Sequence, residues 1–251
     1  MEPILRLATK YDIKWIRDDI IRIISKDWPP QLEKWDFNED ELDVFKSHRV
    51  GGSDNVDLDL PEPYEAIRIA LQYEIPDILT AAFYHLSRLA PLADRRLNND
   101  AMSGTSNGDT ALDLHAEYLS TGGRTAWFGL LSKNQLLQLA RGKHEIENFF
   151  HNVCDDARAS TSKRCQFATP RNQEERVKRK HCLEATEHLS NSRLAEFGRT
   201  RDPLKIMRID HPTSPPSQLC GTCLEHFQRL VYGSRQDLWY HLENFFDFSG
   251  H

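Results

Sequence analysis

The chain has 251 residues, of which 39% are hydrophobic and 28% charged, with a formal net charge of −6 and a pI near 6.0. This length suffices for one large domain or two small ones with a sizeable core. The acidic balance argues against a general nucleic-acid-binding protein, and no apolar run approaches the roughly 20 residues that cross a membrane.

The N-terminus and the cysteines indicate the compartment. The chain begins MEPILRL, with an early acidic residue and without the apolar segment and cleavage site of a secretory signal peptide. Five cysteines, an odd number in a chain this long, do not suit a secreted disulfide framework. We therefore expect an intracellular protein, cytoplasmic, nuclear or both, with reduced thiols.

The first predicted element is a helical hairpin with one apolar side, over residues 4–25. Helical spacing places Leu5 and Tyr11 on one face of its first helix and aligns Ile16 and Ile20 in the second. A one-sided hairpin must pack against another surface. We expect these four residues to form an interaction surface.

The same pattern recurs 62 positions later, over residues 67–86. Tyr11-Asp12-Ile13 aligns with Tyr73-Glu74-Ile75, and apolar residues precede and follow both. Two copies are too few for a solenoid, which needs about three or more. Each copy predicts a helix, a short turn after the Tyr-acid-Ile triplet, and a second helix that folds back.

The first hairpin resembles the last two helices of the BTB/POZ domain, through the pattern L-x-L-A-x-K-Y-x-I-x-x-I that begins at Leu5. Trp28-Pro29, Leu32 and Trp35-Asp36 are then similar to a lineage of fungal, basidiomycete-type BTB/POZ proteins with a long helical C-terminal region. The resemblance continues in order through residues 67–89, Leu136–Lys143, Asp202-Pro203-Leu204, Leu219-Cys220-x-x-Cys223 and Leu238-Trp239.

This resemblance implies an adaptor-type protein that binds other proteins and catalyses nothing. BTB domains usually dimerise and dock on cullin-type scaffolds through strands and helices that should precede Ile4, where this chain has only three residues. A cullin-type scaffold is therefore a candidate partner that the residues present do not support.

Residues 29–62 are rich in Asp and Glu and include Gly51-Gly52-Ser53, which breaks helices. They predict a solvated acidic linker, with a docking segment for a basic partner as the alternative. Residues 91–125 contain several Asn, Ser and Gly clusters and predict a loop insertion around a short helix at 110–119.

Two further long helices are expected in the C-terminal half, and Asp202-Pro203-Leu204 is expected to start a short one. One runs from an N-cap at Ser132 to about Asn152, with Gly142 as a break, and the other begins near Thr222, with a kink at Gly233-Ser234.

All five cysteines follow residue 150, and two form the pair Cys220-Gly-Thr-Cys223, whose spacing suits structural zinc. A full zinc site needs two more ligands. The candidate metal ligands are Cys220, Cys223, Cys165 and Cys182, with Cys154 and His226 as substitutes. The alternatives are buried cysteines that pack as small apolar residues, or a redox pair.

Basic residues are concentrated at Lys163-Arg164, Arg171 and 176–181. They predict a solvated helix face, a nuclear-import signal or a weak nucleic-acid contact. No Tyr or Phe alternates with residues 176–181, so base stacking is not indicated there.

The sequence contains neither a G-x-S-x-G nor an H-E-x-x-H motif, and His181 and Cys182, adjacent on a helix, point about 100° apart. We therefore expect no enzyme and no catalytic or cofactor-binding residues.

The prediction as a whole is an all-α bundle of eight to ten helices. Its parts are a BTB/POZ-like hairpin at 1–28, an acidic linker at 29–62 and a helical region at 63–251. The favoured function is an adaptor-type interaction protein. The alternatives are a zinc-stabilised helical module with weak nucleic-acid contact, or a truncated remnant without function. Protein partners are unnamed, and neither a membrane nor, from the overall charge, nucleic acid is expected as a partner.

Overall fold

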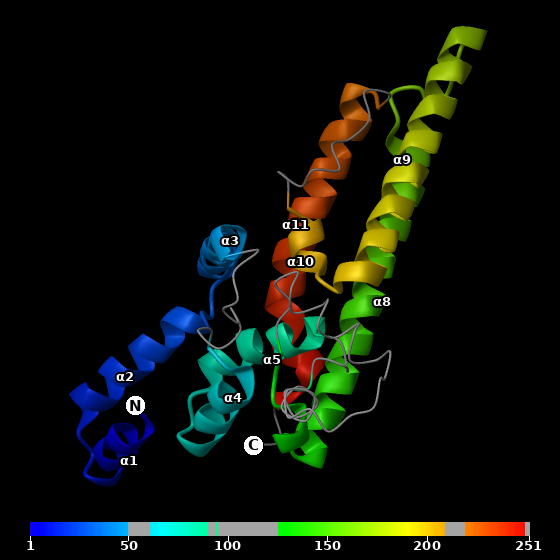
Figure 1. Ribbon diagram of the computed structural model, residues 1–251. Helices are drawn as coiled ribbons and strands as arrows, with labels where there is room; N and C mark the ends of the chain where they lie inside the picture. Colours follow the sequence, from blue (N-terminus) through cyan, green and yellow to red (C-terminus); the bar gives the residue numbers. More distant parts are fainter. Residues whose placement is uncertain (50–60, 90–93, 95–124, 209–218, 249–251) are drawn as a thin grey trace. The chain divides into compact units, whose positions relative to one another are not determined.

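The computed structural model describes residues 1–49, 61–89, 94, 125–208 and 219–248, and confirms the all-α prediction (Figure 1). Apart from two short 3-10 helices and an isolated bridge between Asp94 and Ala126, regular structure in these ranges is α-helical. The helices are α1 (Glu2–Lys10), α2 (Lys14–Asp27), α3 (Leu32–Arg49), α4 (Pro63–Gln72), α5 (Leu79–Arg88), α8 (Lys133–Arg164), α9 (Gln173–Thr200), α10 (Pro203–Ile206) and α11 (Gly221–Phe246).

The chain divides into two compact units that differ from the predicted boundaries. Unit 1 comprises Met1–Ala140 with Phe246–His251, and unit 2 comprises Arg141–Phe245. The predicted 1–28 segment does not form a domain of its own. Arg68 of α4 makes a bidentate ion pair with Glu2, at 2.6 and 2.8 Å, and Arg17 donates to the carbonyl of Tyr73 at 2.9 Å. The two hairpins therefore belong to one folded unit.

The prediction of a solvated linker at 29–62 is wrong for its first half, because residues 32–49 form α3. Leu32 and Trp35 lie three positions apart, on one face of the helix, and each is only 3–4% exposed. The Trp35 ring packs edge-on against Tyr84, with ring centroids 5.5 Å apart. Two buried anchors thus fix a helix whose exposed positions include the acidic residues Glu33, Asp40, Glu41 and Asp43. Residues 50–60 lie outside the described part of the chain.

The two hairpins share one turn, as the sequence repeat predicts. The N–H of Ile13 donates to the carbonyl of Ala8 at 2.8 Å, and the N–H of Ile75 donates to that of Ala70 at the same distance. The acidic residue before each isoleucine is left-handed, with φ of 50° at Asp12 and 53° at Glu74. A left-handed residue bridged in this way is the Schellman ending of a helix.

Glycine at position 74 should stabilise unit 1. A left-handed backbone costs a non-glycine L-residue about 1 kcal/mol or more, so we expect Glu74→Gly to raise the free energy of unfolding by about 1 kcal/mol. Urea denaturation measures the change. As a control, Glu41→Gly, at an exposed position in the interior of α3, should lower stability by about the same amount. Destabilisation by both substitutions would contradict the turn assignment.

The core of unit 1 centres on α5, where Phe83, Tyr84 and Leu86 are almost fully buried. Next to them, Arg88 makes a bidentate ion pair with Glu39 of α3, at 2.6 and 2.8 Å, and lies over the Trp35 ring at 4.8 Å. Both charged side chains are largely shielded, with 10% and 18% exposure. Charge and aromatic packing therefore join α3 to α5.

The predicted interaction residues are mostly internal. Leu5 and Ile20 are buried in unit 1, Ile16 is half-buried, and Tyr11 is 63% exposed. Leu5 and Ile20 hold the hairpin within its own unit, because their side of it faces the core. A polar substitution at Leu5 or Ile20 would therefore disturb the folding of unit 1 and would not test partner binding alone.

In unit 2, α8 and α9 lie side by side and antiparallel (Figure 1). The hydroxyls of Thr161 and Thr186 are 3.0 Å apart, and the Ser190 hydroxyl donates to the carbonyl of Cys154 at 3.3 Å. Phe150 and Phe197 pack between the two helices with ring centroids 5.1 Å apart and the rings tilted by 41°. This pairing fixes the register of the two helices. It therefore also fixes where Cys165 and Cys182 lie along the common helix axis.

Two buried arginines hold the short helix α10 in unit 2. Arg193 of α9 donates to the carbonyl of Ile206 at 2.6 Å, and Arg235 of α11 donates to that of Leu204 at 2.8 Å. These bonds satisfy carbonyl groups at the end of α10 that have no partner within the helix. The three helices α9, α10 and α11 are therefore linked by hydrogen bonds as well as by apolar packing.

Several local predictions can be compared with these helices. Ser132 caps α8 as predicted, because its hydroxyl accepts from the N–H of Gln135 at 3.3 Å. The sequence predicts a break at Gly142 and a kink at Gly233. Neither glycine interrupts its helix, since α8 and α11 continue through them. The insertion at 91–125, with its helix at 110–119, falls almost wholly outside the described residues. Within the described ranges, none of the helices combines the length and apolar character needed to cross a membrane.

Candidate metal centre

Four cysteines from separate parts of unit 2 meet in space. Cys165 follows the last residue of α8, Cys182 lies in α9, Cys220 precedes α11, and Cys223 lies in the first turn of α11. The α8–α9 pairing brings Cys165 and Cys182 to the same height. The Cys-Gly-Thr-Cys turn then presents the other two sulfurs from the start of α11.

The geometry of the cluster suits a tetrahedral ion. All four Sγ atoms lie within 4.8 Å of one another, and those of Cys165 and Cys220 are 4.0 Å apart. With Zn–S bonds of about 2.3 Å, the sulfurs of a tetrahedral site lie about 3.8 Å apart. The cluster therefore needs to contract by no more than about 1 Å at its widest. All four thiols are free, so no disulfide competes for them.

The surroundings of the cluster exclude water from most of it. Cys165, Cys182 and Cys223 are each less than 5% exposed, and Phe167 and Leu219 pack against them. The backbone N–H of Cys220 donates to the sulfur of Cys182 at 3.3 Å. Hydrogen bonds of this kind orient metal-binding sulfurs and offset part of their charge.

The four thiols differ in acidity. Burial alone would raise the pKa of Cys220, but the N–H groups of Cys223 and Gln166 and the thiols of Cys223 and Cys182 donate to its sulfur and lower its pKa to about 7. Burial raises the pKa of Cys182 to about 11, and burial followed by the thiol contacts raises the pKa of Cys223. Without metal, the cluster therefore holds its first negative charge on Cys220.

This order predicts how the metal-free protein reacts with an alkylating agent. We expect iodoacetamide to modify Cys220 first, with a rate that rises with pH and is half-maximal near pH 7, because only the thiolate reacts. Peptide mapping after brief exposure identifies the modified residue. Cys182 should stay unmodified until the pH approaches 11. Equal rates at the two cysteines at neutral pH would contradict the arrangement.

The family models, the curated proteins and the solved structures contain no match to this chain. A proposal about the protein's function therefore depends on its own residues.

The remaining sequence candidates lie apart from the cluster. Cys154 is buried on α8, where burial raises the pKa of its thiol to about 11. His226 is not among the ligands that meet in the described residues, and burial followed by Arg164 and Arg229 lowers its pKa. Neither the substitute cysteine nor the histidine is needed to complete a set of four.

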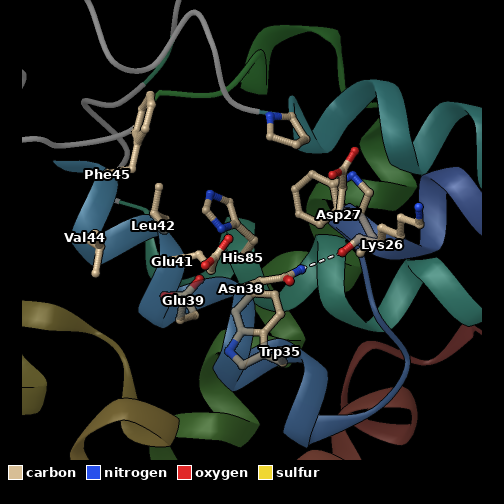
Figure 2. A pocket seen from close by; sticks show the side chains of 12 residues that line it. Lys26, Asp27, Trp35, Asn38, Glu39, Glu41, Leu42, Val44, Phe45 and His85 are labelled. Atoms are coloured by element: carbon tan, nitrogen blue, oxygen red, sulfur yellow. Dashed lines mark hydrogen bonds between the residues drawn. The ribbon is translucent and has the colours of Figure 1, made fainter. Parts of the chain in front are cut away.

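Unit 1 contains a separate pocket of about 620 Å³ between the end of α2 and α3 (Figure 2). Its lining combines aromatic, aliphatic and acidic side chains, among them Trp35, Phe45, Asp27 and Glu41. This volume is typical of small-molecule sites. However, its most enclosed carboxylate, Glu39, already forms the ion pair with Arg88. One of the polar groups of the pocket therefore already has a structural role, in joining α3 to α5. The cysteine cluster is the stronger candidate site.

Sequence reasoning finds the four cysteines but not their surroundings. Two kinds of contact surround the cysteines: apolar packing by Phe167 and Leu219, and N–H donation by Gln166 and Cys220. Both depend on how the chain turns between α8 and α9 and before α11. Spacing along the chain carries no signal for such contacts.

Proposed function

We propose that Cys165, Cys182, Cys220 and Cys223 bind a structural zinc ion, and that the protein is a zinc-stabilised helical module without catalysis. The observation that carries the proposal is the meeting of the four sulfurs within 4.8 Å. Four thiolate ligands close a zinc ion to further ligands, so sites of this type stabilise folds rather than activate water. A bound ion would supply the positive charge that lets several buried thiols ionise together.

The ion would join three helices of unit 2. Cys165 marks the end of α8, Cys220 and Cys223 mark the start of α11, and Cys182 lies within α9. Arg193 and Arg235 link α9 and α11 to α10 in the other half of the unit. Zinc would therefore fasten α9 and α11 at a second level and would tie the end of α8 to them. The alternative prediction, cysteines that pack only as small apolar residues, does not account for sulfur-directed N–H bonds.

Cobalt substitution tests the proposal. Titration of the reduced, metal-free protein with Co²⁺ should produce the thiolate charge-transfer absorption of a four-sulfur site, saturating at one ion per chain, and Zn²⁺ should abolish it. Cys182→Ser should lose this signal. Cys154→Ser, which alters a buried cysteine outside the cluster, should keep it. The proposal would be refuted if Cys182→Ser gave the same charge-transfer absorption as the unaltered chain, or if the unaltered chain gave no such absorption.

A second observation supports an adaptor-type role for unit 1. On the outer side of the first hairpin, Tyr11 is 63% and Trp15 69% exposed, and Ile4 and Leu7 are about half exposed. Large apolar side chains gathered on a surface mark protein-binding sites. The BTB/POZ resemblance and a cullin-type scaffold remain predictions.

The adaptor proposal is tested by affinity purification followed by mass spectrometry. Tyr11→Ser with Trp15→Ser should lose specific partners while the protein stays folded, because both side chains are exposed. Leu5→Asp, in the core, serves as the comparison for loss caused by unfolding. Chaperones alone with the unaltered protein would favour the truncated remnant instead.

A further inference from the structure

The first nine residues of α9 extend beyond the metal centre. Cys182 lies at the level of the centre, whereas α9 begins at Gln173, which at 1.5 Å per residue is about 14 Å further along the helix axis. The neighbouring helix α8 ends at Arg164 and does not accompany it. None of residues 171–181 is buried. Figure 1 shows this yellow-green beginning of α9 at the far end of unit 2. We call residues 171–181 the overhang.

The overhang is strongly basic, in a unit whose charge is opposite to that of the whole chain. Unit 2 contains 17 Lys and Arg against 14 Asp and Glu residues, a net charge of +3. The rest of the chain contains 15 against 24, a net charge of −9. The prediction that nucleic acid is not a partner rests on the sum of these two values. It does not apply to a surface of unit 2 considered alone.

Several cations at this end are not neutralised. Lys163, Arg164, Arg171 and Arg176 are exposed and form no ion pair within the described part of the chain. The two nearest acidic residues of α9 are already engaged. Glu174 pairs with Lys178 at 2.5 Å, and Glu175 accepts from the backbone N–H of Arg171 at 2.6 Å.

The cations of the helix itself share one side. Arg176 and Lys180 are four residues apart, and Arg179 lies next to them, so the three fall on one face. Lys178 lies on the other side, 5.7 Å from the ring of Phe167. Arg176 is exposed and unpaired, Arg179 is half-buried, and Lys180 pairs with Glu184 at 3.5 Å. The overhang thus presents a row of three cations on one face, with Arg176 as the member that has no acidic partner among the described residues.

We propose that the overhang, together with Lys163 and Arg164, binds the phosphate backbone of duplex nucleic acid. A single exposed helix fits the major groove of a duplex, and a row of cations along one face of that helix reaches the phosphates that border the groove. A single strand would need exposed aromatic rings to stack on, and the overhang has none. An acidic protein helix would need apolar anchors, and the overhang offers only Val177. The inference rests on the proposed zinc centre as the rigid base of the overhang.

The expected binding is weak and strongly dependent on salt. Four unneutralised cations that each contact a phosphate give a slope of about −4 in a plot of log affinity against log salt concentration. Affinity should then fall roughly 100-fold between 50 and 200 mM salt. Sequence preference should be small, because phosphate contacts carry no base information.

The test is fluorescence anisotropy with the full, zinc-loaded chain and a labelled 20-base-pair DNA duplex of mixed sequence. The double variant Arg171→Gln/Arg176→Gln should bind at least 10-fold more weakly at low salt and should reduce the salt slope by about 2. The matched control, Arg6→Gln/Arg22→Gln, removes two exposed arginines of unit 1 and should bind as the unaltered chain does. Circular dichroism verifies that each variant stays folded.

Two competitors decide the class of partner. Unlabelled duplex should displace the probe, whereas polyglutamate at equal charge and a single strand of equal length should do so at least 10-fold less well. Equal displacement by polyglutamate would overturn the proposal in favour of an acidic protein, and tighter binding of the single strand would overturn it as well. An unchanged slope in the overhang variant would also overturn it. Zinc content is measured on the same samples. Arginine-dependent binding by a chain without zinc would therefore refute the metal centre but not the overhang.

Discussion

Removal of zinc from the purified protein is expected to lower the free energy of unfolding of unit 2 by about 4 kcal/mol or more. A ligand that binds only the folded state stabilises it by RT ln(1 + [L]/Kd), which is about 4 kcal/mol at a ligand concentration of 1,000 Kd. Structural zinc sites usually exceed this ratio, because four thiolates bind the ion tightly. Unfolding followed by scanning calorimetry, which resolves the transitions of the two units, measures the change with and without chelator.

The zinc effect should also depend on pH. Zinc replaces the thiol protons of the cluster, and the pKa values of Cys182 and Cys223 lie above that of an ordinary cysteine. Binding therefore releases protons, and the stabilisation by zinc should shrink as the pH falls. Cys182→Ser should abolish most of the difference between zinc-loaded and chelated protein. The same shift in Cys182→Ser as in the unaltered chain would place the ion elsewhere.

Replacement of Arg88 by methionine is expected to destabilise unit 1 by about 3–5 kcal/mol. The substitution leaves the carboxylate of Glu39, only 18% exposed, without its bidentate partner, and removes the cation from the Trp35 ring. Loss of one partner of a buried ion pair costs this much because the remaining charge stays in a poorly solvated site. Urea unfolding followed by near-UV circular dichroism, to which the buried Trp28 and Trp35 contribute, measures the effect.

Two controls separate the ion pair from general packing. Glu39→Gln combined with Arg88→Met should cost less than the sum of the two single changes, because no uncompensated charge remains. Arg22→Met, which breaks an ion pair with Asp19 in which both side chains are more than half exposed, should cost less than about 0.5 kcal/mol. Additive losses in the double variant would show that Arg88 acts through packing alone.

The helical class, the repeated turn and the pair Cys220 and Cys223 are predictable from the sequence. The turn is predictable because its contacts are local: a carbonyl five residues back and one left-handed residue determine it. The two-residue spacing of Cys220 and Cys223 marks half of the candidate site. The sequence does not separate Cys165 and Cys182 from the substitutes Cys154 and His226, since their approach depends on the antiparallel register of α8 and α9.

Other features cannot be predicted in this way because tertiary contacts decide them. The acidic composition of residues 29–62 conceals the two buried anchors of α3, Leu32 and Trp35. Gly142 costs a helix about 1 kcal/mol, which the packing of α8 outweighs. The first hairpin carries apolar residues on both sides, so periodicity alone does not show that Leu5 faces inward and Trp15 outward.

Native mass spectrometry of the reduced protein, purified without chelator, tests the central claim most directly. We predict one zinc ion per chain, retained by Cys154→Ser and lost from Cys182→Ser, with Cys220, the reactive thiol of the metal-free cluster, protected from alkylation while the ion is bound. A chain that stays metal-free after incubation with zinc, with Cys220 alkylated at the same rate before and after, would contradict the zinc centre.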